Sequence, residues 1–568
     1  MNNPGLTGAT KAYMPTNKYL PYLLLALSPS VWAAQPPNAS SQIQQIPPAP
    51  IQQKPTPEIN LEQSNLPAVP SADHEKILVR HLKISGAETY SEAELLAITG
   101  FKPDSKLSLA DLRGMALMIA EFYHLNGFFV AQAYLPAQEI KDGIVTIAVI
   151  EGRYGNITLH NQTNLSDNLA NIILKGLNNG DLITYVPLEN RLLLLSDLPG
   201  VKIKSTLMPG SSAGSSDLIV NITPEQRVSG SVDADNAGNR YTGENRIGAT
   251  LNLNNPAGFG DVATIRALTS GSGLNYARAS YQMQWGKAKA GVAYSSLTYA
   301  LGQEFESLQA NGSANISSLY GSYSLMRSRN NNLFFQLSYD AKTFQDKVDS
   351  TFSVTDKRAD VLTASLNGEL HDNFSGGGLN SYSLAWIAGN IDLQTPAMQS
   401  LDAATVQSNG NYSKLGFSFT RLQSVTDLTS LYALVDGQFA SKNLDVSEKM
   451  ELGGMYAVRA YPEGESYADQ GYVLNLESRT LLPKLSEKLS GQMQFIGFVD
   501  SGTVQANKNS WLLAQNTRTL SGAGMGLNWS GAHNFMLRTY YARKLGNDAA
   551  TSAPDTSGRF WMQAVKYF

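Results

Sequence analysis

Apolar and polar residues alternate along the chain over the long stretch Gln226–Phe568. Within Asn275–Trp285, alanine, tyrosine, methionine and tryptophan occupy every second position from residue 277, and arginine, serine and glutamine lie between them. The same alternation recurs around residues 333–340, 381–388 and 535–544. A period of two places one set of side chains on each face of a β-strand. The pattern therefore predicts a mainly β region whose strands have one apolar and one polar face.

A soluble β-sandwich would show the same alternation, but three features favour a transmembrane β-barrel. The segments run about ten residues, turns such as Arg327–Asn332 join them, and the chain ends on the aromatic residue Phe568. In lipid no strand edge can stay unpaired, so a spanning sheet has to close on itself. Roughly 340 residues, at about 20 per strand and connection, predict about 16 strands in residues 226–568. The polar face predicts hydrated lumen residues at Arg278, Gln282, Gln336, Gln492 and Gln494.

The region before the barrel shows a repeated pattern of strands and amphipathic helices. In residues 76–152 the pattern predicts the order β-α-α-β-β, and residues 153–225 repeat that order. Two consecutive units with one element order form an internal repeat. The first unit should have strands at 77–84, 128–135 and 144–150 and helices at 92–98 and from Ser108 to Gly127. The second unit should have strands at 154–159, 201–207 and 217–222 and helices at 167–177 and 187–195.

The N-terminus has the features of a secretory signal peptide over residues 1–34. Lys11 and Lys18 precede the apolar run Leu20–Leu27, and Ala33 and Ala34 suit cleavage. The run is about half of the roughly 20 residues that a membrane-spanning helix needs. No later segment offers 18 consecutive apolar residues, so a membrane interpretation rests on strands.

Residues 35–75 form a Pro-rich segment without apolar periodicity, which predicts an extended, semi-rigid linker. A short helix is one alternative within it. Thr56 could cap this helix, Pro57 suits the first helical position, and the helix would continue to about Asn65. The other alternative is an unstructured linker throughout.

Composition narrows the functional classes. The net charge is −4 and no basic stripe is present, so we expect no nucleic-acid partner. Cysteine is absent, which removes thiolate chemistry and suits an oxidising compartment, and no phosphate-binding Gly-rich loop occurs. His371 and His533 of the barrel lie in no Ser/His/acid setting, and Asp340, Asp436 and Asp500 are explained more simply as solvated lumen acids than as a carboxylate site. We therefore expect no enzyme activity, no metal and no cofactor.

The most specific motifs lie late in the alternating region. Two glycines precede a Val-Arg-Ala-Tyr sequence, and a Phe-x-Asp-x-Gly sequence follows some 40 residues later. Asp500 shares its strand parity with Gln492 and Phe498, so its side chain should face the lumen. Arg459, on a loop folded into that lumen, could bind Asp500 through a bidentate, charge-assisted bond. The candidate site residues are Gly453, Gly454, Val458, Arg459, Ala460, Tyr461, Glu477, Arg479, Phe498, Asp500 and Gly502.

These motifs resemble those of the outer-membrane superfamily of barrel-assembly and two-partner secretion proteins (Omp85-like). In that superfamily the sixth extracellular loop carries Val-Arg-Gly-Tyr/Phe and a nearby strand carries Phe-x-Asp-x-Gly. Ala460 stands where the family has Gly, which matters if the loop backbone needs φ > 0. The two β-α-α-β-β units resemble polypeptide-transport-associated (POTRA) domains. The whole chain is most similar to a two-partner secretion transporter of the hemolysin secretion/activation type, a group that includes contact-dependent-inhibition transporters.

The resemblance implies an outer-membrane transporter with periplasmic N-terminal domains, surrounded by lipid and expected to be a monomer. Its POTRA domains would capture an unfolded exoprotein, and the barrel would pass that exoprotein to the cell surface without ATP. A hemolysin, an adhesin, a contact-dependent-inhibition toxin or a heme-scavenging protein all stay open as the partner. In the family an N-terminal helix plugs the barrel, and Thr56–Asn65 is the candidate here. Plug and loop would have to move, so the Arg459–Asp500 pair is expected to be a latch of moderate strength.

Two other functions are alternatives to secretion. An outer-membrane protein assembly factor of the same superfamily is the alternative closest to it. A passive porin is the more distant one, because it would have no use for two protein-binding domains.

Overall fold

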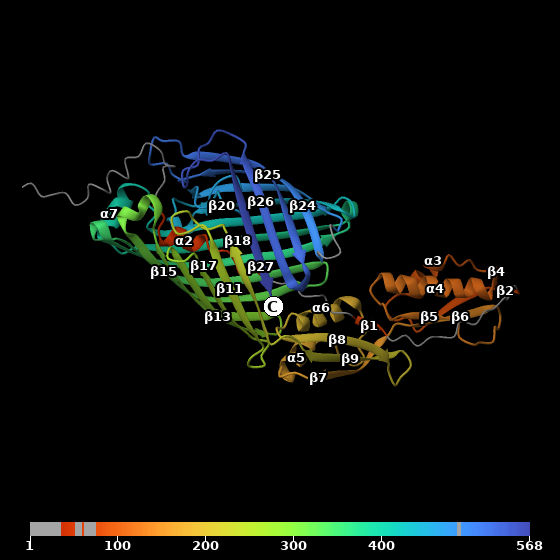
Figure 1. Ribbon diagram of the computed structural model, residues 1–568. Helices are drawn as coiled ribbons and strands as arrows, with labels where there is room; N and C mark the ends of the chain where they lie inside the picture. The colour runs from red at the N-terminus through yellow and green to blue at the C-terminus, as the bar shows by residue number, and fades with distance from the viewer. Residues whose placement is uncertain (1–35, 51–58, 62–74, 485–489) are drawn as a thin grey trace, which may run out of the picture.

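The computed structural model describes residues 36–50, 59–61, 75–484 and 490–568. Figure 1 shows a β-barrel with two small α/β domains beyond one of its ends. None of the described helices is long and apolar enough to cross a membrane. The predicted signal peptide, residues 1–34, and most of the second half of the predicted linker lie outside the described residues.

The first α/β domain has the predicted order, except that the predicted strand 77–84 is broken at Arg80 into two strands and a short strand, β4, is added between the helices. Its two helices begin at capping boxes, Ser91 with Glu94 and Ser108 with Asp111, which satisfy the free N–H groups of each first turn. Both helices contribute to one apolar core with the sheet β3-β6-β5. The elements are β2 (Lys76–Val79), β3 (His81–Ser85), α3 (Glu92–Thr99), β4 (Ser105–Ser108), α4 (Leu109–Leu125), β5 (Gln132–Tyr134) and β6 (Ile144–Ile150).

The second α/β domain repeats this plan. Its helices pack leucines and isoleucines against one face of a sheet, and Leu188, Leu195 and Val220 are fully buried there. The sheet has the order β1-β8-β9-β7, in which β8 and β9 are antiparallel and β7 runs parallel to β9. The elements are β7 (Arg153–Asn161), α5 (Asp167–Leu174), α6 (Tyr185–Ser196), β8 (Val201–Pro209) and β9 (Ser215–Pro224).

The linker contributes a strand where a helix was one alternative. Ile59–Leu61 forms β1, which pairs in parallel with β8, so the predicted helix over 56–65 is wrong at these three positions. The rest of that segment, 56–58 and 62–65, lies outside the described residues. A helix of about ten residues is marginal in water without packing partners. The edge of β8 instead offers the backbone ready hydrogen-bond partners.

The barrel closes with sixteen antiparallel strands, so the predicted strand number is confirmed. The last strand pairs with the first, Gln563–Tyr567 with Ser231–Asp235, and this pairing closes the barrel. The strands are β10 (Val228–Asp235), β11 (Arg246–Asn254), β12 (Val262–Thr269), β13 (Leu274–Trp285), β14 (Ala288–Ala300), β15 (Ala310–Arg327), β16 (Asn331–Val348), β17 (Ser353–Asp372), β18 (Gly378–Leu393), β19 (Gly410–Ser424), β20 (Thr429–Ala440), β23 (Gln470–Leu481), β24 (Gly491–Gln505), β25 (Thr517–Gly531), β26 (Phe535–Lys544) and β27 (Gly558–Tyr567).

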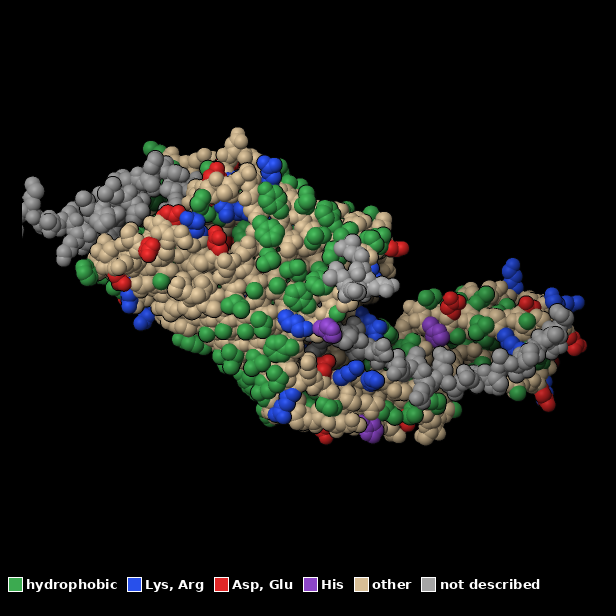
Figure 2. Space-filling view, in the orientation of Figure 1, with side chains coloured by type: hydrophobic (Ala, Val, Ile, Leu, Met, Phe, Trp, Pro, Cys, Tyr) green, Lys and Arg blue, Asp and Glu red, His purple; other side chains and the backbone are tan. Residues whose placement is uncertain are grey.

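The two faces of the barrel wall differ as the alternation predicts. On β24, Phe495 and Val499 are 40% and 46% exposed on the outer face, whereas Phe498 and Asp500 are buried on the inner face. Figure 2 shows hydrophobic side chains spread over the visible wall, with charged side chains gathered toward its ends. An apolar outer face is what contact with lipid tails requires. The residues predicted for the lumen have the inward parity of their strands: Arg278, Gln282, Gln336, Gln492 and Gln494.

The second α/β domain is bonded to the rim where the barrel has its short turns. Asp197, just after α6, accepts hydrogen bonds of 2.8 and 2.7 Å from the guanidinium of Arg327 at the end of β15. Asn190 of α6 donates to the Arg327 carbonyl oxygen at 2.9 Å. Asn164 donates to the carbonyl oxygen of Asn255, in the β11–β12 turn, at 2.8 Å. These contacts hold the domain against the mouth of the barrel.

We expect Asp197→Ala to loosen this attachment. The substitution leaves Arg327 without its carboxylate partner, and hydrogen bonds to charged groups contribute about 1.5–3 kcal/mol. Amide exchange around the C-terminal end of α6 should become about ten-fold faster, with barrel strands unchanged, in hydrogen-exchange mass spectrometry of the full chain. Glu139→Ala is the matched control, because it removes an ion pair to Lys141 that is almost fully exposed. Equal exchange in the two variants would contradict a role for Asp197 in docking.

Candidate functional site in the barrel lumen

The connection between β20 and β23, residues 441–469, folds into the barrel; we call it the inner loop. It contains the 3₁₀ turn Val446–Glu448 and a short ladder between β21 (Met450–Glu451) and β22 (Tyr467–Ala468). Its middle section is apolar and buried against the inner faces of β23 to β26. The Val-Arg-Ala-Tyr motif lies in that section, and Val458, Ala460 and Tyr461 are at most 1% exposed. The loop therefore packs as an inner layer on one side of the lumen.

Arg459 is bound to two carboxylates on the lumen wall. Its Nε and Nη2 donate to the two oxygens of Asp500 at 2.9 and 2.7 Å, and its backbone N–H donates to Asp500 at 3.0 Å. Its Nη1 donates to Glu477 at 2.7 Å. The Arg459 guanidinium also lies 3.5 Å from the ring centre of Phe498, which adds a cation–π contact. The motifs thus meet in one buried cluster on β23 and β24.

The surroundings of the pair satisfy its remaining hydrogen-bond groups. Asn475 bridges Asp500 and the carbonyl oxygen of Ala457, at 2.7 and 2.8 Å. Arg479 donates to the second oxygen of Glu477 at 2.8 Å, so two cations balance two carboxylates. Trp561 Nε1 donates to the Arg459 carbonyl oxygen at 2.7 Å. A buried ion pair is stable only when its remaining hydrogen-bond donors and acceptors also have partners. Removing one member of such a pair costs about 3–5 kcal/mol.

Ala460 fits because the wall opposite it has no side chain. A Cβ atom at Gly522 of β25 would lie 2.4 Å from the Ala460 Cβ, closer than two non-bonded carbon atoms can approach. Ala460 is not among the described non-glycine residues with positive φ, so this loop position needs no glycine. The departure from the family motif is thus compatible with the loop backbone.

We expect Gly522→Ala to unseat the loop and Ala460→Gly to compensate. The added methyl group of the single variant overlaps that of Ala460, and overpacking costs about 1–3 kcal/mol. The double variant restores the space. Secretion and loop protection from added protease should fall in Gly522→Ala and recover in the double variant. A double-mutant cycle with no coupling would contradict direct packing of these two residues.

The glycines of the motifs leave room for neighbouring segments to approach closely, both within the inner loop and between the loop and the wall. Gly454 has φ +103°, and a Cβ there would meet the Glu463 carboxylate, while one at Gly453 would meet the carbonyl oxygen of Pro462. On the wall, a Cβ at Gly502 would lie 2.3 Å from Leu452 of the inner loop. Every residue of the two motifs therefore belongs to the loop or to the wall that receives it.

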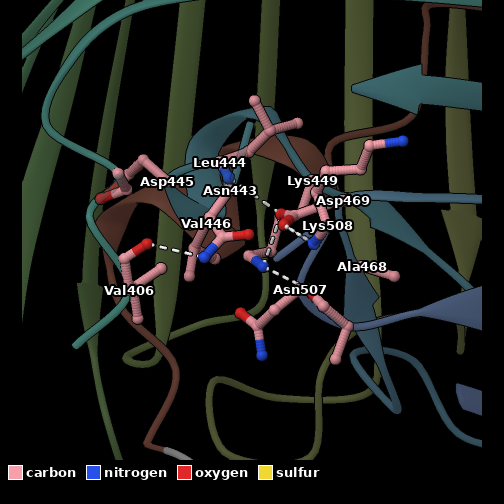
Figure 3. A network of polar contacts seen from close by, with 12 residues as sticks. Val406, Asn443, Leu444, Asp445, Val446, Lys449, Ala468, Asp469, Asn507 and Lys508 are labelled. Carbon is pink, nitrogen blue, oxygen red and sulfur yellow. Dashed lines mark hydrogen bonds and ion pairs between the residues drawn. The ribbon is translucent and has the colours of Figure 1, made fainter. Parts of the chain in front are cut away.

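A second set of polar contacts, not predicted from the sequence, holds the ends of the inner loop (Figure 3). Asp469 is fully buried and binds Lys449 Nζ at 2.7 Å; it also accepts from the backbone N–H groups of Leu444 and Lys508 at 2.9 and 2.7 Å. Glu448 binds Lys342 of the wall at 2.8 Å. Isolated acids and lysines in loops give no periodic signal, so their pairing appears only in three dimensions.

A third anchor ties the inner loop to the β26–β27 connection. Glu465 binds Arg518 at 2.7 Å and accepts from the backbone N–H groups of Thr551 and Ser552 at 2.8 and 3.0 Å. Glu465 and Arg518 are both buried. The tip and both ends of the loop are thus fixed by separate charged contacts.

A helix within the predicted linker lies beside the inner loop, so the prediction of an extended segment over residues 35–75 is wrong at 39–44. This helix, α2 (Ala39–Gln44), begins at Asn38, which forms a capping box with Ser41. Figure 1 shows it within the barrel outline, near α7 (Pro396–Ala404) and at the opposite end from the α/β domains. Pro36 and Pro37 followed by Asn-x-x-Ser is a helix-start signal that the sequence analysis missed.

Helix α2 bonds both to the wall and to the inner loop. The Ala39 N–H donates to Asp346 of β16 at 2.7 Å, and Gln44 donates to the Val446 carbonyl oxygen at 2.7 Å. Lys357 of β17 donates to Ser40 and also binds Asp445 of the inner loop, both at 2.6 Å. Apolar contacts hold the helix as well, because Ala39 is fully buried in a cluster with wall residues such as Leu297 and Phe344, and Ile43 packs against this cluster.

The structure does not assemble the carboxylates considered for an enzyme site. Asp340, Asp436 and Asp500 lie on β16, β20 and β24. Asp500 is fully buried and bound to Arg459, so the expectation of a solvated acid is wrong for this residue. Within the described part of the chain, no three His, Asp or Glu side chains could hold a metal ion.

Two small α/β domains beyond one end of a sixteen-strand barrel, together with the family models that match them, define an outer-membrane β-barrel transporter with periplasmic N-terminal domains. The chain belongs to the haemolysin secretion/activation protein family ShlB/FhaC/HecB, whose model matches residues 214–529. A ShlB-type POTRA domain model matches residues 77–152. The resemblance to two-partner secretion transporters is therefore confirmed.

Known relatives agree with this family. The heme/hemopexin transporter protein HuxB of Haemophilus influenzae is 29% identical over 470 residues, which cover 82% of each chain. The solved structure of CdiB from Escherichia coli matches with a TM-score of 0.67 and 19% identity, covering 97% of this chain and 98% of that one. BamA from Haemophilus ducreyi, solved without POTRA domains 1–3, has a TM-score of 0.53 and 14% identity, covering 87% and 100%. At such identities both structures show the fold alone, and the family match favours secretion over the assembly-factor alternative.

Proposed function

We propose that this chain captures an unfolded exoprotein in the periplasm through its POTRA domains and passes it through the barrel lumen to the cell surface. The observation that carries the proposal is a lumen that holds two separate elements, α2 and the inner loop, each attached to the wall by polar and apolar contacts. A passive porin of this size would hold an open aqueous channel. A plug that can leave the lumen suits a transporter that opens only while an exoprotein passes through it.

Transport needs no nucleotide in this proposal. The sequence has no phosphate-binding Gly-rich loop, and folding of the exoprotein at the cell surface would prevent it from sliding back. Hydrated polar side chains such as Arg278 and Gln336 would line the path and hold the moving chain only weakly.

The partner would be one large secreted exoprotein, and the transporter would act as a monomer without catalysis. HuxB is named for heme and hemopexin, so a heme-scavenging partner is one candidate beside a hemolysin, an adhesin and a contact-dependent-inhibition toxin. We propose no enzyme activity, because the relatives are named as transporters.

Deleting residues 76–225 tests the proposal. The exoprotein encoded beside the transporter gene should stop appearing outside the cell, while other outer-membrane barrels keep their normal levels. Normal secretion would refute capture by the POTRA domains. Loss of the other barrels with continued secretion would favour the assembly alternative. Asp197→Ala offers a milder version, in which both domains stay but their attachment is weaker.

A further inference from the structure

Three carboxylates and one guanidinium lie close together where the inner loop meets the C-terminal end of α2. Arg246 of β11 donates from its Nε to Asp235 of β10 at 2.8 Å, and both side chains are buried. Glu451 of β21 and Glu463 of the inner loop are partly buried and lie near the same guanidinium and near each other. One cation cannot balance these three acids if all of them are ionised.

The backbone of the inner loop holds the two glutamates in place. Glu451 accepts a hydrogen bond from the N–H of Gly464, and Glu463 accepts one from the N–H of Met455 at 3.3 Å. Two carboxylates in one site resist the ionisation of both, because their charges repel. Removal of water from around the carboxyl raises the pKa of Glu463 to about 7. Removal of water, and then the charge of Glu463, raise the pKa of Glu451 well above its usual range.

A cavity connects Glu463 to the end of the barrel that faces away from the POTRA domains. Its volume is about 270 Å³, and the β10–β11 connection and the start of β27 form its other walls. Protons can therefore reach Glu463 from the cell surface. Arg240, which also lines the cavity, is bound to Glu304 at 2.8 Å. The other titratable groups around the two glutamates are Asp235, Glu244, Arg246, Tyr456, Tyr467 and Arg559.

The same groups hold the C-terminal end of α2. Arg246 donates from its Nη1 to the carbonyl oxygen of Gln45 at 2.9 Å, and the Gln45 amide donates to the Tyr467 hydroxyl at 2.6 Å. A Cβ atom at Gly464 would lie 2.9 Å from the Gln45 amide nitrogen, so the turn that holds Glu451 packs directly against the plug. A change of charge on the glutamates therefore acts on the contacts of α2.

We propose that Glu451 and Glu463 form a proton-binding site at the cell-surface end of the lumen, and that the bound proton helps to hold α2 in place. Loss of the proton leaves negative charges beside Asp235 that compete with Gln45 for Arg246 and draw water into the contact. The inference rests on the proposed function only in that α2 leaves the lumen when the pore opens.

Linkage gives the direction of the effect. In an open, hydrated pore a glutamate has a pKa of about 4.3, whereas with the plug in place the pKa of Glu463 is about 7. The plugged state therefore binds more protons than the open state. This contribution to closure is present at low pH and is lost as the pH rises through about 7. Within that window each pH unit changes the balance by about ten-fold for one proton.

Planar-bilayer recordings of the full-length transporter test the site. From about pH 6 to about pH 8, at constant salt, the ratio of open to closed time of the wild-type pore should rise by about ten-fold. Glu451→Gln with Glu463→Gln keeps the hydrogen-bond acceptors without the charge, so this double variant should stay closed at both values. Glu304→Gln is the matched control, because Glu304 lies at the same end of the barrel in a half-exposed ion pair, and it should respond to pH as the wild type does.

Infrared spectroscopy detects the proton itself. The difference between wild-type spectra at low and high pH should contain the C=O stretching band of a protonated carboxylic acid, and the double variant should lack this band. An absent band, or the same pH response of the pore in wild type and double variant, would overturn the site. A titrating band without any response of the pore would overturn the link to α2. Neither measurement uses the exoprotein, so failure here is distinct from failure of the proposed function.

Discussion

Secretion will fall by at least about ten-fold when Arg459 is replaced by alanine, while barrel insertion stays normal. The substitution leaves the carboxylates of Asp500 and Glu477 buried without their cation, which costs about 3–5 kcal/mol. Arg459 holds the tip of the inner loop against β23 and β24, on the side of the lumen opposite α2. We expect this attachment to keep the loop beside the wall when α2 leaves, in place of the moving loop that the family resemblance implies, and so to leave the rest of the lumen free. A detached tip would lie across the path of the exoprotein.

Two matched variants separate the latch from general effects of charge. Arg459→Lys keeps the charge but cannot bind two acids with a planar fork, so its secretion should lie between wild type and Arg459→Ala. Arg278→Ala removes another lumen arginine, whose Nη1 donates to Ser295 of the wall, and should leave secretion nearly unchanged. Heat-modifiable mobility of each folded barrel reports insertion. Equal losses for Arg278→Ala and Arg459→Ala would show that lumen charge, not the latch, matters.

Removing the plug will open the pore to ions. A variant without residues 38–45 should show large, long-lived currents in planar bilayers, whereas the wild-type transporter should be closed most of the time. The reason is geometric, since barrels of 16–18 strands leave an aqueous channel unless something fills it. In this chain α2 lies against the side of the lumen formed by β14 to β16, next to the inner loop.

Point variants give a graded version of the same measurement. Asp346→Asn weakens the acceptor for the Ala39 N–H and for the Tyr299 hydroxyl, so the plug should leave more often and brief openings should appear. Asp360→Asn is the control, because Asp360 binds Tyr339 on the outer face of the wall. Closed behaviour of the plug deletion would mean that the inner loop alone blocks the channel.

The parts of the fold that follow from periodicity could be predicted from the sequence. Alternation along residues 275–285 and 492–500 predicts which side chains face lipid. The same alternation was sufficient to predict that Asp500 faces the lumen. The capped helices of the first POTRA domain were also readable, because Ser91 and Ser108 leave local signals. Strand number followed from length and from the requirement that the sheet close.

The parts that depend on contacts between distant segments could not be predicted. The linker strand Ile59–Leu61 forms because β8 has a free edge, which no local sequence pattern reveals. The anchors Asp469–Lys449 and Glu465–Arg518 join residues of the inner loop to one another and to β25, without periodic signal. Helix α2 had a readable start at Asn38, but only the lumen around it stabilises six residues as a helix.

The most direct test of the account is to lock the plug to the wall and measure export. Ala39→Cys with Asp346→Cys, joined by a disulfide or a short bis-thiol linker, fastens α2 to β16 at a contact of 2.7 Å between the Ala39 nitrogen and the Asp346 carboxylate. The account predicts that the linked transporter secretes no exoprotein above background, and that cleaving a disulfide link restores secretion. Secretion at the wild-type rate with the plug covalently held in the lumen would show that the exoprotein does not pass through the barrel.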